Sequence, residues 1–159
     1  MDPLSISAGA ITFIGAALTI TREALNLASS LSQCKNDLQD LITELKELEK
    51  LLRDLHNLNE AISGCTDEHV REAGISPDFV EVCYQDLGRL KKTLENLQSK
   101  LQGTIVERVN LRIFWAIKKP TKIDDCLSKI RNRKATLCVA LGVFQRYRSP
   151  TAHSLLSNS

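Results

Sequence analysis

The side chains that could serve as nucleophiles, general bases or metal ligands are few and scattered. The 159 residues include five cysteines and three histidines. There is no CxxC pair, and the phosphate-loop, metalloprotease, serine-hydrolase and kinase motifs are absent from the sequence. Cys65, His69 and Cys83 are three conceivable zinc ligands, but a fourth ligand and a familiar spacing are lacking. The sequence therefore predicts no enzyme, no metal and no cofactor.

The remaining reactive groups have structural explanations. Two pairs of adjacent carboxylates, Asp67-Glu68 and Asp124-Asp125, stand at the starts of expected helices, where the helix dipole favours negative charge. The cysteines are odd in number, which indicates unpaired and mostly buried thiols in a reducing compartment; they are Cys34, Cys65, Cys83, Cys126 and Cys138. We therefore expect a cytoplasmic location.

The most distinctive chemistry of the chain is hydrophobic. Residues 3–21 carry no charge, and Leu4, Ile11, Leu18 and Leu25 recur every seven residues, which is helical spacing. A helix of this length spans roughly 28 Å, about the hydrocarbon thickness of a membrane. Because its faces are all apolar or small, it belongs inside a bundle or inside a bilayer. Five Ser and Thr residues make a permanent span marginal, so two interpretations remain: a core helix, or a core helix that inserts when triggered.

Charge is divided unevenly between the two ends of the chain. Residues 1–103 have a net charge of −6 and residues 104–159 a net charge of +8. The two parts could neutralise each other within one bundle, or the second could offer a basic face to anionic lipid. The candidates for such a lipid or partner interface are Trp115, Lys118, Lys119, Lys129, Arg131, Arg133 and Lys134. Trp115 is the only tryptophan, and a lone tryptophan in a helical protein is more often a core residue. Too few aromatic residues accompany the basic ones to indicate nucleic-acid binding.

Leucine-rich periodic segments predict an all-α fold, a bundle of four to five main helices. The first is expected over residues 3–28. Ser30 and Gln33 resemble a capping box that opens a second helix of about 33 residues, ending before Gly64. This second helix carries a heptad stripe, which is wider than a two-stranded coiled coil requires and so favours a bundle. The stripe comprises Leu31, Cys34, Leu38, Leu41, Leu45, Leu48, Leu52, Leu55 and Ile62, widened by Ile42, Leu51 and Leu58.

The second half of the chain predicts three further helices. Residues 65–76 form a connector with about two helical turns, and Ser76-Pro77-Asp78 starts a third helix that ends before Gly103. Residues 104–119 are expected to form a shorter helix, and Pro120 to open a last helix that reaches about residue 148. We therefore predict one domain over residues 1–148, followed by a disordered tail or linker over residues 149–159.

Two segments carry a family resemblance. The opening MDPLSISAGAITFIGAALTI resembles the start of the N-terminal domains of fungal STAND proteins, which are NLR-like receptors, in the HeLo-like group. The later segment RIFWAIKKPTKIDDCLSKIRNRKATLCVAL resembles the family's Trp-Ala and Lys-Lys stretch, followed by a leucine-spaced helix. Pro120 departs from the family pattern, in which charged residues usually continue the segment.

The resemblance implies a regulated cell-death domain. Such domains oligomerise on a trigger and then permeabilise the plasma membrane through their first helix. Self-association, anionic lipids and an NLR-like receptor or amyloid-signalling protein are the implied partners, and the chain would move from cytoplasm to plasma membrane. The implied inserting residues are Leu4, Ile6, Ile11, Phe13, Ile14, Leu18 and Ile20. The alternative is a non-lytic oligomerisation or adaptor module of an NLR-like immune receptor.

Overall fold

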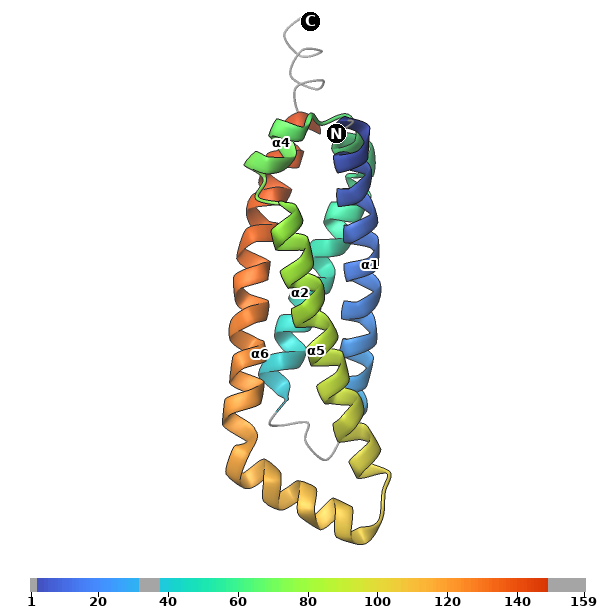
Figure 1. The fold of residues 1–159 in the computed structure, drawn as a ribbon, viewed down its shortest axis with the longest axis vertical. Helices are drawn as coiled ribbons and strands as arrows, with labels where there is room; N and C mark the ends of the chain where they lie inside the picture. Colours follow the sequence, from blue (N-terminus) through green and yellow to red (C-terminus); the bar gives the residue numbers. More distant parts are fainter. Residues whose placement is uncertain (1–2, 32–37, 149–159) are drawn as a thin grey trace, which may run out of the picture.

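A computed structural model describes the backbone of residues 3–31 and 38–148, and within them the side chains of residues 9–31, 38–110, 113 and 123–147. This part of the chain is helical and contains no strand. Four helices are long and form a bundle (Figure 1). They are α1 (Pro3–Ser30), α2 (Gln39–Asn57), α5 (Pro77–Leu101) and α6 (Ile105–Arg148). The all-α bundle predicted from the sequence is confirmed.

The order of the helices around the bundle places α1 opposite α6. Both α1 and α6 pack against α2 and α5. In Figure 1, α1 and α5 run down the molecule while α2 and α6 run up it. Two short helices, α3 (Asn59–Ser63) and α4 (Asp67–Glu72), carry the chain between α2 and α5 at the upper end. Each of these short helices also contacts α1.

The connection through α4 follows local signals that the sequence displays. The Thr66 hydroxyl caps α4 by accepting a hydrogen bond from the His69 backbone N–H at 3.4 Å. Gly74 ends it in the left-handed region, with φ of 82°, and its N–H donates to the Arg71 carbonyl. The N–H of Ile75 donates to the Val70 carbonyl, which completes a Schellman motif. The predicted helical turns before Gly74 are confirmed.

The prediction of one continuous second helix is wrong. Ser30 ends α1 instead of capping α2, because its hydroxyl donates to the Leu27 carbonyl at 2.8 Å within the last turn. At the other end, Leu58 separates α2 from α3 and is flanked by Asn57 and Asn59, which are weak helix formers. Residues 32–37, including Cys34, lie outside the described part. The stripe itself is confirmed, since every other member is buried.

The prediction of two helices divided at Pro120 is also wrong. Helix α6 continues from Ile105 to Arg148 with Pro120 inside it. Proline in a helix interior removes one backbone hydrogen bond and clashes with the preceding turn, which bends the helix. The ribbon of α6 is bent accordingly: its first part crosses the lower end of the bundle and the rest runs up the side (Figure 1). The tail predicted over residues 149–159 lies outside the described residues.

Candidate membrane-active helix

Helix α1 is sequestered along one face. Two rows of buried residues, each with a seven-residue step, form this face: Ala10, Ala17, Ala24 and Leu31 in one, and Ile14, Thr21 and Ala28 in the other. The small alanine side chains allow the backbone of α1 to approach its neighbours closely. The predicted row through Ile11, Leu18 and Leu25 lies at the edge of this face, because only Leu18 is fully buried there. The alanine spacing in the sequence was the signal for the true seam.

Phe13 is the largest buried side chain of α1 and joins it to α5. It is 2% exposed, and its ring packs edge-on against Phe79 and Tyr84, at centroid separations of 6.0 and 5.4 Å. The sequence analysis named Phe13 only as an implied inserting residue and did not predict its aromatic partners. These partners lie 66 and 71 residues further along the chain, where no local pattern connects them to Phe13. Edge-to-face aromatic pairs of this kind stabilise the fold by more than the burial of their apolar surface alone would.

The opposite face of α1 is made of small residues and is open to solvent. Gly9, Thr12 and Thr19 are exposed, and Gly15 and Ala16 are half-buried. A Cβ atom built on Gly9 or Gly15 would meet no other atom within 4 Å. The Thr19 hydroxyl donates to the Gly15 carbonyl of its own helix at 3.1 Å. This face therefore accepts substitutions that leave the packing of the bundle intact.

Ion pairs begin where the uncharged segment of α1 ends. The Arg22 guanidinium lies 3.3 Å from Glu49 of α2, and Lys91 of α5 lies 2.8 Å from the Glu23 carboxylate. Residues 3–21 carry no charge and so form no ion pair. The buried hydroxyl of Thr21 is satisfied within the helix by donating to the Ala17 carbonyl at 2.7 Å. Apolar packing is thus the main attachment of the described part of this segment, residues 9–21.

Five of the seven predicted insertion residues have described side chains. Phe13, Ile14 and Leu18 are buried, while Ile11 and Ile20 are half-buried against the core. Leu4 and Ile6 belong to α1, but their side chains lie outside the described residues. The structure therefore collects the described members on one side of α1, in contact with the interior of the bundle.

Three of the predicted basic residues form ion pairs inside the bundle. Lys134 donates to Glu44 at 2.6 Å and also to Glu47, while Arg131 donates to Glu44 at 3.0 Å. Hydrogen bonding from Lys134 lowers the pKa of Glu44, and the same contact raises the pKa of Lys134. Arg133 donates to Asp86 of α5 at 2.9 Å. The uneven charge of the sequence is thus partly neutralised between α6 and its neighbours.

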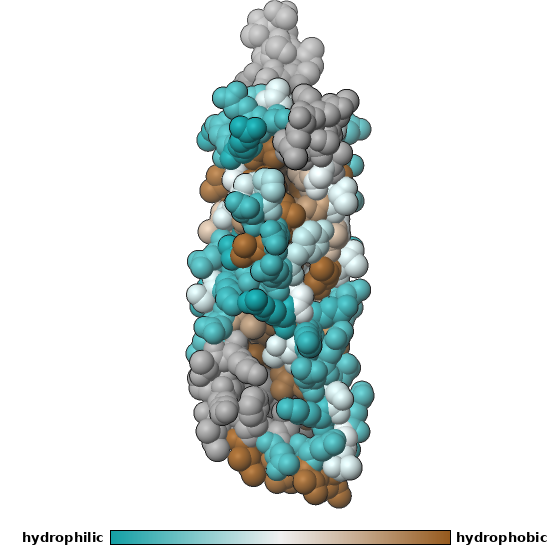
Figure 2. Space-filling view, viewed as in Figure 1, coloured by the Kyte–Doolittle hydropathy of each residue, from teal (hydrophilic) through white to brown (hydrophobic). Residues whose placement is uncertain are grey.

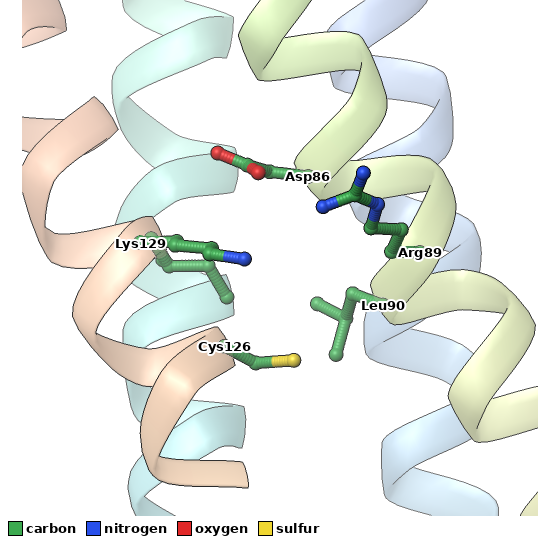
Figure 3. Close-up of a pocket in the computed structure, with 6 residues that line it drawn as sticks. Asp86, Arg89, Leu90, Cys126 and Lys129 are labelled. Atoms are coloured by element: carbon green, nitrogen blue, oxygen red, sulfur yellow. The ribbon is translucent and has the colours of Figure 1, made fainter. Parts of the chain in front are cut away.

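Of the other members of the predicted interface, Lys129 is the one whose side chain the structure describes. Lys129 is half-buried and has no ion-pair partner among the described residues. It lines a cavity of about 30 Å³ between α5 and α6, beside Asp86, Arg89 and Cys126 (Figure 3). Such a cavity has room for water but not for an organic substrate. The side chains of Trp115, Lys118 and Lys119 lie outside the described residues.

The described cysteines are free thiols of differing exposure. Cys65 and Cys83 are buried, Cys126 is half-buried and Cys138 is exposed. Burial raises the pKa of the Cys83 thiol to about 12, so it is protonated at neutral pH and a poor nucleophile.

The His69 ring accepts a hydrogen bond from the Thr66 backbone and stacks on Tyr147. Over the part of the chain that the structure describes, His, Cys, Asp and Glu side chains form no group of three able to hold a metal ion.

None of the helices, so far as their residues are described, combines the length and the apolar character that crossing a bilayer requires. The membrane role of α1 remains a prediction.

Comparison with known proteins places the chain in a family. No curated protein and no solved structure is significantly similar to it. A family model described as "Pigment biosynthesis cluster protein PigL N-terminal" matches residues 1–158, nearly the whole chain. This is a fungal HeLo-like N-terminal family, which agrees with the group that the sequence resembles, although it does not single out the STAND proteins. The chain is therefore a member of the PigL N-terminal family.

Proposed function

We propose that this domain is a regulated cell-death effector that permeabilises the plasma membrane through α1 after triggered oligomerisation. The observation that carries the proposal is the form of α1: an uncharged amino-terminal segment that is held in the bundle by apolar contacts. Membership of a HeLo-like family supports the same function. Cytoplasmic residence, relocation on activation and a receptor or amyloid-signalling partner belong to this proposal.

The energetics favour a silent resting state. Releasing α1 exposes Phe13, Ile14 and Leu18 to water, and each such side chain contributes roughly 1.5–3 kcal/mol when buried. Insertion into a bilayer removes these side chains from water again and so restores this free energy, because lipid hydrocarbon is as apolar as the core. Assembly of several copies concentrates the segments and offsets the cost of ordering them. A monomer should therefore be inactive and an oligomer active.

The ion pairs define how far the release extends. Residues 3–21 carry no charge, so their release from the bundle breaks no ion pair of their own side chains. Going further breaks the contact of Arg22 with Glu49 and that of Glu23 with Lys91. We therefore infer a boundary at Thr21–Arg22, with the helix upstream of it as the inserting segment.

Dye leakage from anionic vesicles tests the proposal, with Gly9→Lys as the decisive variant. Gly9 is exposed and a side chain there meets no neighbour, so the resting bundle accommodates lysine. A lysine within an inserted helix costs up to about 3 kcal/mol when it lies near the bilayer centre. We expect the wild-type chain, fused to an inducible oligomerisation tag, to release dye on induction, and Gly9→Lys to reduce the rate at least tenfold.

Gly88→Lys is the matched control. Gly88 lies on the exposed side of α5 and also leaves open space for a side chain. It introduces the same charge at a helical glycine outside the inserting segment, so leakage should equal that of the wild type. Equal leakage by Gly9→Lys and Gly88→Lys would contradict insertion of α1. An assembled protein that releases no dye would instead indicate the non-lytic oligomerisation module.

A further inference from the structure

The start of α6 exposes more apolar surface than any other described segment. We call residues 104–113 the α6 arm. Four large side chains are exposed within nine residues: Ile105 by 78%, Val106 by 68%, Val109 by 49% and Ile113 by 53%. The other large hydrophobic side chains that are exposed in the described part are Val82, Val139 and Tyr147, which stand apart from one another in the sequence. Figure 2 shows hydrophobic side chains gathered at the lower end of the molecule, where the arm crosses.

The four side chains share one side of a well-defined helix. Their spacing of one, three and four residues puts them within about a third of the helix circumference. A capping box starts the helix: the Thr104 N–H donates to the Glu107 carboxylate at 3.1 Å, and the Glu107 N–H donates to the Thr104 hydroxyl at 3.4 Å. Residues 104–110 and 113, whose side chains the structure describes, are all exposed, so the bundle does not cover the side of the arm that carries the four apolar side chains.

Charge favours an anionic surface as the occupant of this face. Residues 104–122 contain five basic residues and one acidic residue. The acidic one, Glu107, is turned back on the Thr104 amide. Arg108 is exposed and has no ion-pair partner in the described part of the chain, unlike Arg131, Arg133 and Lys134. A helix with an apolar face and basic flanks binds at the interface of anionic bilayers.

A second copy of the chain suits the face less well. Stable protein interfaces bury more than about 1,000 Å² in total, and each side of a standard one draws on 20 to 30 residues. The arm offers four apolar side chains on a narrow helix. Binding to a membrane surface does not require such a large buried area, because shallow insertion of a few side chains adds to the electrostatic attraction of the basic residues.

We propose that the α6 arm is a peripheral docking site for the surface of an anionic lipid bilayer, used by the resting bundle. The arm lies at the lower end of the molecule, whereas the amino terminus of α1 lies at the upper end (Figure 1). Docking through the arm requires no release of α1. It is therefore separate from the insertion proposed above, and it brings the closed protein to the membrane.

Vesicle flotation of the monomer, without any trigger, tests the docking site. The probes are vesicles of phosphatidylcholine alone and of phosphatidylcholine with phosphatidylserine. We expect the wild-type chain to float with the anionic vesicles only, and Val106→Asn/Val109→Asn to lower its partition coefficient about tenfold. Val82→Asn/Val139→Asn is the matched control, since both valines are exposed outside the arm, and it should bind within about twofold of the wild type.

Three results would overturn the docking site. They are a wild-type chain that does not float, equal loss of binding in both double variants, and a dimer seen by light scattering that the arm variant dissociates while vesicle binding is unchanged. Gly9→Lys should float like the wild type, because α1 stays packed during docking. Failure of docking is thus distinguishable from failure of insertion, which the leakage assay measures.

Discussion

Phe13 is the side chain on which the resting position of α1 most depends. It is almost fully buried, and it links α1 to two aromatic rings of α5. The residues around it on the same face are alanines, which contribute close approach but little apolar area. Removing the ring therefore weakens the attachment of α1 more than any other single truncation in the uncharged segment.

Phe13→Ala should destabilise the bundle by about 3–5 kcal/mol, because it removes the buried ring and leaves a cavity. Chemical denaturation followed by circular dichroism measures this difference. Thr19→Ala is the control: Thr19 is exposed, and its hydroxyl bonds only within its own helix, so the change should stay within about 0.5 kcal/mol. A loss below about 1 kcal/mol for Phe13→Ala would show that α1 is held by other contacts.

For the helices, the sequence predicted which face is buried better than it predicted where each helix begins and ends. The leucine stripe of the second helix is buried wherever it is described, because heptad spacing reports a continuous apolar face. The break at Leu58 was missed because the stripe passes through it undisturbed. Pro120 was interpreted as a helix start, but α6 continues through it and bends. In α1, the predicted insertion residues Phe13, Ile14 and Leu18 are buried in the bundle, and their insertion stays a prediction. The alanine seam received too little weight because alanine is common on every helix face.

The pairing of α6 with α2 and α5 also could not be predicted from the sequence. Net charge predicts that acidic and basic parts attract each other, but not which residues meet. Glu44 and Lys134 are 90 residues apart and are brought together by the order of the helices. Glu44 is 13% exposed and Lys134 is 23% exposed, so solvent screens their contact only in part. The contact joins α2 to α6, which both remain in the bundle when α1 is released.

The contact of Glu44 with Lys134 makes stability depend on pH. Because the pKa of Glu44 is lowered in the folded state from its ordinary 4.5, its contribution is present above that value and is lost as pH falls through the folded pKa. Glu44→Gln should lower the free energy of unfolding by about 1–2 kcal/mol at pH 7. The difference from the wild type should disappear at pH values below the folded pKa, as measured by denaturation across pH.

Glu60→Gln provides the comparison for this titration. Glu60 is exposed on α3 and has no ion-pair partner in the described part of the chain. Its replacement should change stability by less than about 0.5 kcal/mol at any pH. A difference for Glu44→Gln that persists unchanged into acid would contradict the ion pair as its cause.

At the scale of the whole molecule, one bundle carries two different apolar surfaces. The arm of α6 is exposed at rest, whereas the described apolar face of α1 is covered. The exposed arm suits reversible contact with a membrane surface, and the covered face of α1 suits a release of this helix that happens only on a trigger. Four long helices make this division possible, since α6 contacts both α2 and α5 independently of α1.

A fluorophore on the exposed face of α1 measures most directly whether this helix leaves the bundle and inserts into the bilayer. Gly9→Cys in a background without other cysteines, labelled with an environment-sensitive dye, leaves the buried face untouched. The account predicts water-exposed emission from the monomer, even on vesicles. After induced oligomerisation on anionic vesicles it predicts a blue shift and quenching by nitroxide lipids. Unchanged, unquenched emission from an oligomer that nevertheless releases dye would contradict the insertion of α1.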